Sequence, residues 1–329
     1  MATATELSLE CIHTFSVEAD PSEYTNTINA VAISPNNQKI VAVGDKFRGG
    51  RIDANRYTFT MWDLGAGEKT DIASATGYKP HTADLVSVAF STDSRSIMVG
   101  SKAFNHLSED ISLSTWSIEN ILSYTGHTTE SGWILAIIPH PSENTFAACG
   151  YNKIQIWQGL VRAGDFRQVQ SWESHTACTM MFSPDGQRLY SGGMDGHIRL
   201  WEASSGELIK TFDKQDYLIR SLVFSQDGQT IISGSDQRIK IWDASTGEVK
   251  HSFFAHPDWI RDLTVTADDR FLLSAGDTRV KIWDLETGEP SGTIEAHDNL
   301  IRSMVLSRDG TILVTGDRQG VVKVWKLKL

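Results

Sequence analysis

Histidine, serine and aspartate recur along the chain in sets that contain the residue types of a hydrolase triad. The two most complete sets, each closed by a tryptophan, are His175, Ser191, Asp195 and Trp201, and His256, Ser274, Asp277 and Trp283. In a catalytic triad the histidine accepts the serine proton and the aspartate orients the histidine, and an enzyme needs this arrangement once. Because the set is repeated, the pattern favours a structural role, and we expect no catalytic residues.

Other motifs that mark chemistry are missing from the sequence. There is no phosphate-binding loop, no HExxH metal motif and no GxSxG nucleophile motif. The three cysteines, Cys11, Cys149 and Cys178, show no CxxC spacing and cannot all pair, which fits a reduced compartment better than a metal site. The sequence therefore predicts neither a metal nor a cofactor.

Composition narrows the choice of partner and location. The 329 residues carry a net charge of −11, which argues against general affinity for nucleic acids or anionic membranes. No run of about 18 apolar residues is present, so no membrane span is expected. We therefore expect a cytoplasmic protein that binds neither nucleic acid nor membrane.

A repeat of about 42 residues organises the whole chain. Seven tryptophans each end a short apolar alternation: Trp62, Trp116, Trp157, Trp201, Trp242, Trp283 and Trp325. A second apolar run precedes each of them, as in IRSLVF (219–224), and turn motifs such as SPDG (183–186) and STGE (245–248) separate the runs. Each unit is thus predicted to form four short antiparallel strands, which we term a, b, c and d.

On these residues the chain resembles the WD-repeat family along essentially its whole length, and its regular turns are similar to those of bacterial members. The Trp-Asp pair itself is present at Trp62-Asp63, Trp242-Asp243 and Trp283-Asp284. The resemblance implies an all-β, seven-bladed propeller of four-stranded antiparallel blades in a single domain, 1–329. The expected blades span approximately 24–75, 81–124, 127–172, 175–212, 215–254, 256–294, and 297–329 together with 7–15.

The last blade of this predicted ring requires the N-terminal strand. The chain ends just after the third strand of the seventh repeat, and ECIHTF (10–15) matches the pattern of the fourth strand ELIKTF (207–212). We therefore predict that strand 7–15 completes blade seven and removes two free sheet edges.

The resemblance also assigns the repeated triad-like sets. In this family aspartate holds histidine, and serine links histidine to the tryptophan indole inside each blade; His297 and Trp325 continue the set in blade seven. Blade five departs with Gln215 at the histidine position, and Gln319 takes the aspartate position of blade seven. We expect these two blades to be less tightly held.

Two features of the top rim, where the family's d–a and b–c connections lie, predict a binding surface. A long b–c insertion in blade one, 45–57, carries Arg48 and Arg51. The second residue of strand a, which faces the mouth of the central channel in this family, is arginine in blades five to seven. The predicted contacts are Asn29, Arg220, Arg261 and Arg302, with Trp133, Leu218, Trp259 and Leu300 two residues before such positions, and Arg318.

This pattern predicts a non-catalytic scaffold that binds an acidic or phosphorylated segment of a partner protein, because arginine forks match carboxylates and phosphates. The alternative is a regulatory propeller that binds a small anion or an effector domain at the channel mouth; an enzyme ranks third. A structural reading also stands: the arginines could pair with nearby aspartates such as Asp216, Asp258 and Asp298, and the tryptophans could pack under the loops.

Overall fold

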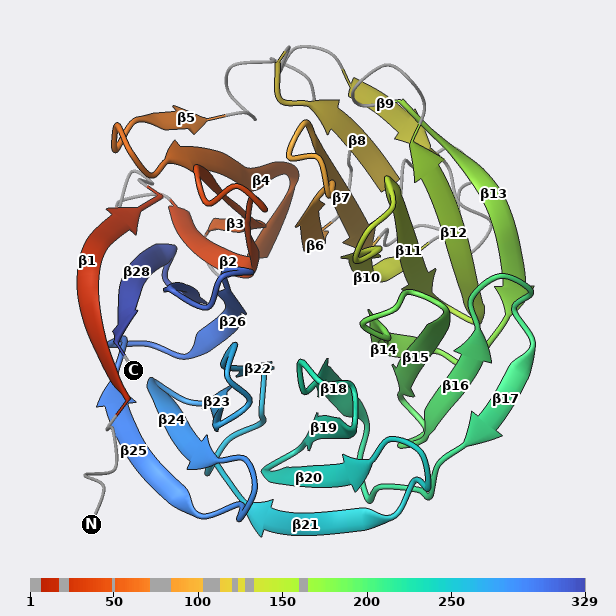
Figure 1. The fold of residues 1–329 in the computed structure, drawn as a ribbon. Helices are drawn as coiled ribbons and strands as arrows, with labels where there is room; N and C mark the ends of the chain where they lie inside the picture. Colours follow the sequence, from red (N-terminus) through yellow and green to blue (C-terminus); the bar gives the residue numbers. More distant parts are fainter. Residues whose placement is uncertain are drawn as a thin grey trace.

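The chain forms a closed ring of seven four-stranded antiparallel sheets (Figure 1). This is a computed structural model, and it describes residues 7–17, 24–48, 51–71, 84–102, 113–119, 124–127, 133–159 and 165–328. Strand a of each blade lines the centre of the ring and strand d its outside. The all-β, seven-bladed fold class predicted from the sequence is confirmed.

The strands follow one another around the ring in chain order, four to a blade. Blades one to three comprise β2 (Tyr24–Ile33), β3 (Lys39–Arg48), β4 (Arg51–Asp63) and β5 (Lys69–Asp71); β6 (Asp84–Phe90), β7 (Ser96–Lys102), β8 (Leu113–Ser117) and β9 (Tyr124–His127); and β10 (Ile134–Pro139), β11 (Thr145–Gly150), β12 (Lys153–Gly159) and β13 (Phe166–Glu173). Blades four and five comprise β14 (Ala177–Phe182), β15 (Arg188–Gly193), β16 (Ile198–Glu202) and β17 (Leu208–Thr211), and β18 (Ile219–Phe224), β19 (Thr230–Ser235), β20 (Arg238–Asp243) and β21 (Val249–Phe254). Blades six and seven comprise β22 (Asp262–Val265), β23 (Phe271–Ala275), β24 (Arg279–Asp284) and β25 (Pro290–Glu295), and β26 (Ile301–Leu306), β27 (Ile312–Asp317), β28 (Val321–Lys328) and β1 (Ser8–Ser16).

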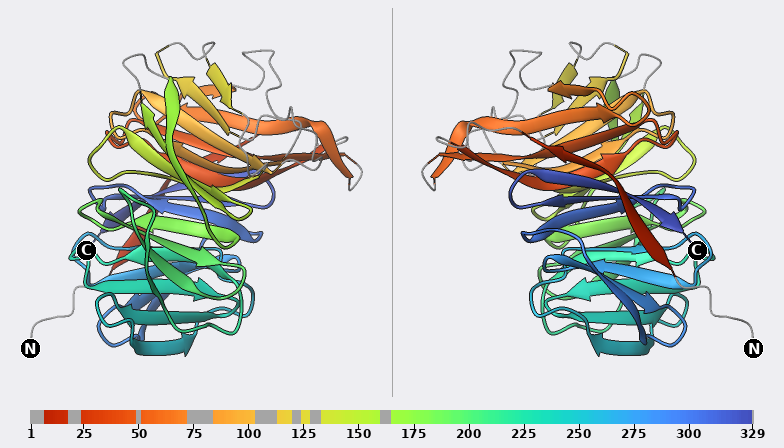
Figure 2. Two further views of the ribbon diagram at one scale, coloured as in Figure 1. Left: turned by 90° about the vertical axis from the view of Figure 1, so that its right-hand side faces the viewer. Right: turned by 90° about the vertical axis from the view of Figure 1, so that its left-hand side faces the viewer.

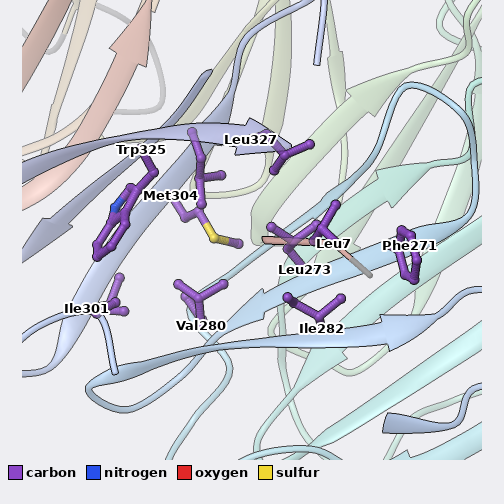
Figure 3. Packing of buried hydrophobic residues seen from close by; sticks show 12 residues of the cluster. Leu7, Phe271, Leu273, Val280, Ile282, Ile301, Met304, Trp325 and Leu327 are labelled. Carbon is purple, nitrogen blue, oxygen red and sulfur yellow. The ribbon is translucent and has the colours of Figure 1, made fainter. Parts of the chain in front are cut away.

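The hydrophobic core lies between neighbouring blades rather than inside any one of them. Figure 3 shows one such layer, in which Leu273 and Ile282 of blade six face Met304 and Trp325 of blade seven. Every residue of β23 is buried, whereas β25 on the outside of the same blade alternates between exposed and half-buried positions. A single blade would therefore leave both of its apolar faces in water, and the ring is needed to cover them.

Blade seven is completed by the N-terminal strand, as predicted. β1 runs antiparallel to β28, from the pair Ser8↔Lys328 to the pair Ser16↔Val321. Leu7, just before β1, is buried in the layer between blades six and seven. Phe15 stacks on Trp62 of blade one with ring centroids 5.3 Å apart. The strand thus covers apolar surface on both sides of the blade that it closes.

The insertion expected as a loop in blade one is instead an extension of two strands. β3 and β4 stay paired as far as Arg48↔Arg51, and Figure 2 shows this hairpin projecting beyond the ring. Main-chain pairing satisfies the polar groups of an insertion that a loop would leave to solvent. The side chains of Arg48 and Arg51 lie outside the described residues.

The repeated histidine, serine and tryptophan residues form hydrogen-bonded chains within blades. In blade six, Ser274 Oγ lies 2.8 Å from His256 Nε2 and accepts a 2.9 Å bond from Trp283 Nε1. The Asp277 carboxylate lies 3.6 Å from His256 Nδ1, which is longer than a hydrogen bond. Burial lowers the pKa of His256, so its neutral form is favoured.

Blade four contains the same arrangement. Ser191 Oγ lies 2.7 Å from His175 Nε2 and 2.9 Å from Trp201 Nε1, and Asp195 lies 3.2 Å from His175 Nδ1. Serine is thus positioned by two buried side chains rather than activated beside an open site.

Blade seven departs from the expectation drawn from Gln319, which was wrong. Asp317, not Gln319, holds His297, with Oδ2 3.1 Å from Nδ1, and Thr315 takes the place of serine between His297 and Trp325. Thr315 and Asp317 are two residues apart on one strand and therefore point to the same face. In blade five, Gln215 replaces histidine and donates a 2.6 Å bond to Ser233.

Candidate binding surface at the mouth of the central channel

A recurrent β-bulge directs one side chain of each inner strand toward the channel. In six blades the pairing between strands a and b is interrupted by one extra residue on strand a. In blade five, for example, the register shifts between Ile219 and Ser221. The residues at these bulges are Asn29, Val86, Leu135, Cys178, Arg220 and Arg302. A bulge leaves its extra residue out of the ladder and re-aims its side chain. In blade six the ladder begins at Asp262, one residue after Arg261.

These positions share one cavity. All six bulge residues and Arg261 line a central cavity of about 560 Å³ that runs along the inner strands of all seven blades. At the opposite end of the channel, Arg308 of blade seven donates a 2.8 Å hydrogen bond to the carbonyl of Pro141 in blade three. This contact spans the ring between the a–b turns of two distant blades, so we take the end with the arginines as the mouth.

Trp259 lies between two of the arginines. The guanidinium carbon of Arg220 is 4.3 Å from the centroid of the Trp259 ring, and that of Arg261 is 5.2 Å from it. Cation–π contacts of this kind are worth about 0.5–2 kcal/mol and hold a guanidinium against a flat surface. Trp259 is 44% exposed, which does not fit the structural alternative in which this tryptophan packs under the loops.

Arg302 of blade seven is positioned by Asn29 of blade one, the next blade around the ring. The Arg302 guanidinium donates a 3.2 Å bond to Asn29 Oδ1. The Asn29 amide nitrogen donates in turn to Asp45 Oδ2 at 2.6 Å and to the Leu85 carbonyl at 2.9 Å. Because both amide protons of Asn29 are used, its oxygen must face Arg302.

The arginines do not form the ion-pair ring that was considered as a structural alternative. Among the described residues, no carboxylate oxygen lies within 4 Å of a side-chain nitrogen of Arg220, Arg261 or Arg302. Burial, together with repulsion between the guanidinium groups, lowers the pKa of Arg261 to about 10. All three remain cationic at neutral pH. Within the described residues, Asp258 acts on Arg220 and Arg261, and Asp45 acts on Arg302, only from beyond ion-pair distance.

Of the acidic residues that line the channel, Asp45 and Asp84 lie in blades one and two, and Asp262 in blade six already accepts several hydrogen bonds. Burial, followed by repulsion from Asp84, raises the pKa of Asp45 to about 7. Asp262 accepts hydrogen bonds from the backbone N–H groups of Leu263 and Met304 and from Ser221 and Ser303, although burial raises its pKa to about 6. These bonds join blades five, six and seven beneath the arginines.

The remaining predicted contact residues divide into two groups. Leu218 and Leu300 are half-buried near the arginines, and Arg318 is exposed next to them, where its charge acts on Arg261 and Arg302. Trp133 lies apart from them: its ring contacts Tyr151 edge-on at 6.1 Å, with Lys102 Nζ 4.9 Å from its centroid. Trp133 therefore belongs to a second cation–aromatic group in blades two and three.

Sequence reasoning missed several exposed side chains on this rim. Tyr217, next to Leu218 in the connection to strand a of blade five, is 61% exposed, and Met194 and Tyr151, in b–c turns, are 58% and 56% exposed. Large apolar side chains that remain exposed around a polar centre mark interaction surfaces. Their position in connections that precede strand a or follow strand b was the available signal.

The described residues show little that would support other chemistry. Within these ranges, no group of three or more histidine, cysteine, aspartate or glutamate side chains is arranged to hold a metal ion. The same part of the chain has no helix long and apolar enough to cross a membrane. A second cavity of about 590 Å³, between blades three and four near the a–b turns, is lined by Glu143, Asp185 and Glu202 and is unsuited to an anion.

Comparison with known proteins places the chain in a family. The profile of the WD40 family (WD domain, G-beta repeat) matches residues 118–158, 166–202, 206–243, 247–284 and 288–326. The chain therefore belongs to the WD40 repeat family. Propellers of this family are generally non-catalytic and commonly act as scaffolds that bind proteins or peptides.

The curated relatives are distant and longer. Over 153 residues the chain is 28% identical to Protein groucho of Drosophila melanogaster, covering 46% of this chain and 20% of the relative. It is 27% identical over 185 residues to the U3 small nucleolar RNA-associated protein 15 homolog of Xenopus laevis (54% and 32%), and 28% over 190 residues to Autophagy-related protein 16 of Arabidopsis thaliana (58% and 34%). The chain thus spans 20–34% of their lengths.

Proposed function

We propose that this propeller is a protein-interaction scaffold that binds an acidic or phosphorylated segment of a partner at the mouth of its central channel. The proposal rests mainly on the state of Arg220, Arg261 and Arg302. These side chains are half-buried, and among the described residues no carboxylate lies within ion-pair distance of them. Half-buried charges that lack a partner are costly in the free protein, and an anionic partner would offset that cost.

The surroundings of the arginines favour a segment of a protein over an isolated ion. Exposed Trp259 contacts two of them, and exposed Tyr217 lies three residues before Arg220 in the connection that enters blade five. Aromatic residues and arginine are the side chains most enriched at the centres of protein interfaces. On a chain of net charge −11, a local cationic group also selects the orientation of an acidic partner.

The second candidate is a regulatory propeller that binds a small anion at the same mouth. The central cavity of about 560 Å³ lies within the size range of small-molecule sites and favours this alternative. Both candidates use the same arginines, and they differ in whether Trp259 and Tyr217 are covered in the complex.

The proposal predicts that charge reversal at the mouth abolishes partner retention without unfolding the ring. The triple variant Arg220→Glu, Arg261→Glu and Arg302→Glu should retain none of the proteins that the wild type enriches from a lysate of the source organism, as identified by mass spectrometry. A matched variant reverses three exposed arginines near the a–b turns at the other end of the channel, Arg95, Arg188 and Arg270, and should behave like the wild type.

A ribonuclease treatment and a folding control by circular dichroism complete the experiment. Because the name of one relative refers to a small nucleolar RNA, the lysate is also treated with ribonuclease, and retention should be unchanged. If both triple variants recover the same proteins as the wild type while their circular dichroism remains native, the partner binds elsewhere and the proposal is wrong.

A further inference from the structure

The three arginines of the channel mouth converge from consecutive blades, and their positions are set independently. Trp259 holds Arg220 and Arg261 by cation–π contact, and Asn29 holds Arg302 by a hydrogen bond. The electrostatic effect of Arg302 reaches both Arg220 and Arg261, and that of Arg220 reaches Arg261, so the guanidinium groups lie within mutual range. Three like charges are thus gathered at one place by contacts that are not ion pairs.

Hydrogen-bonding capacity at this place is also unused. Arg261 Nε is buried and has no hydrogen-bond partner among the described residues. Among the described residues, no hydrogen bond joins a side-chain N–H group of Arg220 or Arg261 to another residue, and Arg302 donates only to Asn29, so several N–H groups can donate to a ligand. An anion that satisfies the group must therefore accept bonds from several guanidinium groups at once.

Charge and geometry select among anions. A carboxylate has two oxygens and one negative charge, which suits a single bidentate arginine. A phosphate monoester has three terminal oxygens and a charge of about −1.5 to −2 at neutral pH, so it can give one oxygen to each of three guanidinium groups. We infer that Arg220, Arg261 and Arg302 form one seat for a single tetrahedral dianion of the phosphate class, with Trp259 as the residue that positions two of the three.

This inference narrows the proposed ligand from an acidic or phosphorylated segment to a segment anchored by one phosphorylated side chain. That the phosphate belongs to a protein segment rests on the proposed function. Tyr217, which is exposed in the connection three residues before Arg220, would then contact the flanking residues of such a segment. A free phosphate has the same anchor chemistry without flanking contacts, and the two sources are separated by experiment.

The test is a titration of the intact protein with three forms of one heptapeptide, carrying serine, glutamate or phosphoserine at its centre between glycine and alanine residues. Isothermal titration calorimetry should show the phosphoserine form binding at least roughly tenfold more tightly than the glutamate form, and the serine form not binding. Inorganic phosphate should compete with the phosphoserine peptide.

Variants connect the result to the seat. Arg220→Gln, Arg261→Gln and Arg302→Gln should each weaken phosphoserine binding by roughly tenfold or more, and Arg188→Gln, an exposed arginine near an a–b turn, should not. Trp259→Leu keeps every charge but should still weaken binding, because Arg220 and Arg261 lose their support. The nitrogen–proton NMR signal of Arg261 Nε should shift on addition of phosphate in the wild type.

The possible outcomes distinguish failure of this inference from failure of the proposed scaffold function. Equal affinity for the glutamate and phosphoserine forms would overturn the dianion seat and leave the proposed scaffold intact. Binding of phosphate and not of any peptide would support the seat and favour a small anion over a protein segment. Failure of phosphate and of the phosphoserine peptide to bind at millimolar concentration would overturn the inference, whatever the lysate experiment shows.

Discussion

Deletion of residues 1–15 is expected to prevent folding of the ring or to lower its melting temperature by at least about 5 °C. The deletion removes all of β1 except Ser16, and with it seven of the eight residue pairs between β1 and β28, and it exposes the edge of β28. It also removes buried Leu7 and half-buried Phe15 from the layers on either side of blade seven; full burial of such a side chain is worth about 1.5–3 kcal/mol, and the contribution of Phe15 is smaller. Together the two side chains contribute roughly 2–5 kcal/mol before the lost strand pairing is counted, which is a large part of the stability of a typical domain.

The experiment compares thermal unfolding of three chains by circular dichroism. A chain shortened by residues 1–6 keeps Leu7 and all of β1 and should unfold like the full-length protein. A synthetic peptide of residues 7–17, added to the chain that lacks 1–15, should restore the melting temperature in a concentration-dependent way. An unchanged melting temperature in the 1–15 deletion would show that β1 does not close the ring.

Asp45→Asn should stabilise the protein at about pH 8 by on the order of 2–4 kcal/mol and change little near pH 4. Burial and the neighbouring Asp84 raise the pKa of Asp45 from 3.8 to about 7, so the folded protein favours its protonated form. The stability associated with this group is complete below about pH 4 and is lost as the pH rises through 7. Asparagine is neutral throughout and escapes this loss.

Urea unfolding at several pH values between 4 and 8 measures the difference between the variant and the wild type. Asp243→Asn is the matched control with the opposite sign, because hydrogen bonds from Ser245 and Thr246 lower the pKa of this exposed carboxyl. Asp243→Asn should therefore destabilise the protein above the ordinary pKa of aspartate. A difference between Asp45→Asn and the wild type that stays constant from pH 4 to pH 8 would contradict the account of Asp45.

The repeat made most of the fold predictable. Seven tryptophans in register define seven sheets, and the match between 10–15 and 207–212 identifies the strand that closes the last one. The same register located the residues that face the channel, because the bulge recurs at an equivalent position. In a repeat architecture, one correctly aligned unit places the others.

What the repeat could not predict are contacts between residues of different blades. Trp259 of blade six contacts Arg220 of blade five, and Asn29 of blade one contacts Arg302 of blade seven. Such contacts depend on side-chain conformations and on the rotation between neighbouring blades, which spacing in sequence does not encode.

Local departures from the repeat were the other source of error. In blade six the aspartate lies six residues before the tryptophan, and the same count back from Trp325 leads to Gln319. The residue that holds His297 is Asp317, two residues earlier in the chain. The length and polar composition of the insertion 45–57 predict a loop, whereas the two glycines at its centre, between Phe47 and Ile52, favour the hairpin turn that the extended strands β3 and β4 require.

The central claim, that a partner protein sits on the channel mouth, is tested most directly by photo-crosslinking. A benzophenone amino acid replaces Tyr217, three residues before Arg220, or in separate variants Val249 on an outer strand and Arg188 near an a–b turn. We expect a crosslinked partner from position 217 alone, lost when Arg220, Arg261 and Arg302 are changed to glutamate. Crosslinking from position 188 or 249, and none from position 217, would contradict the account.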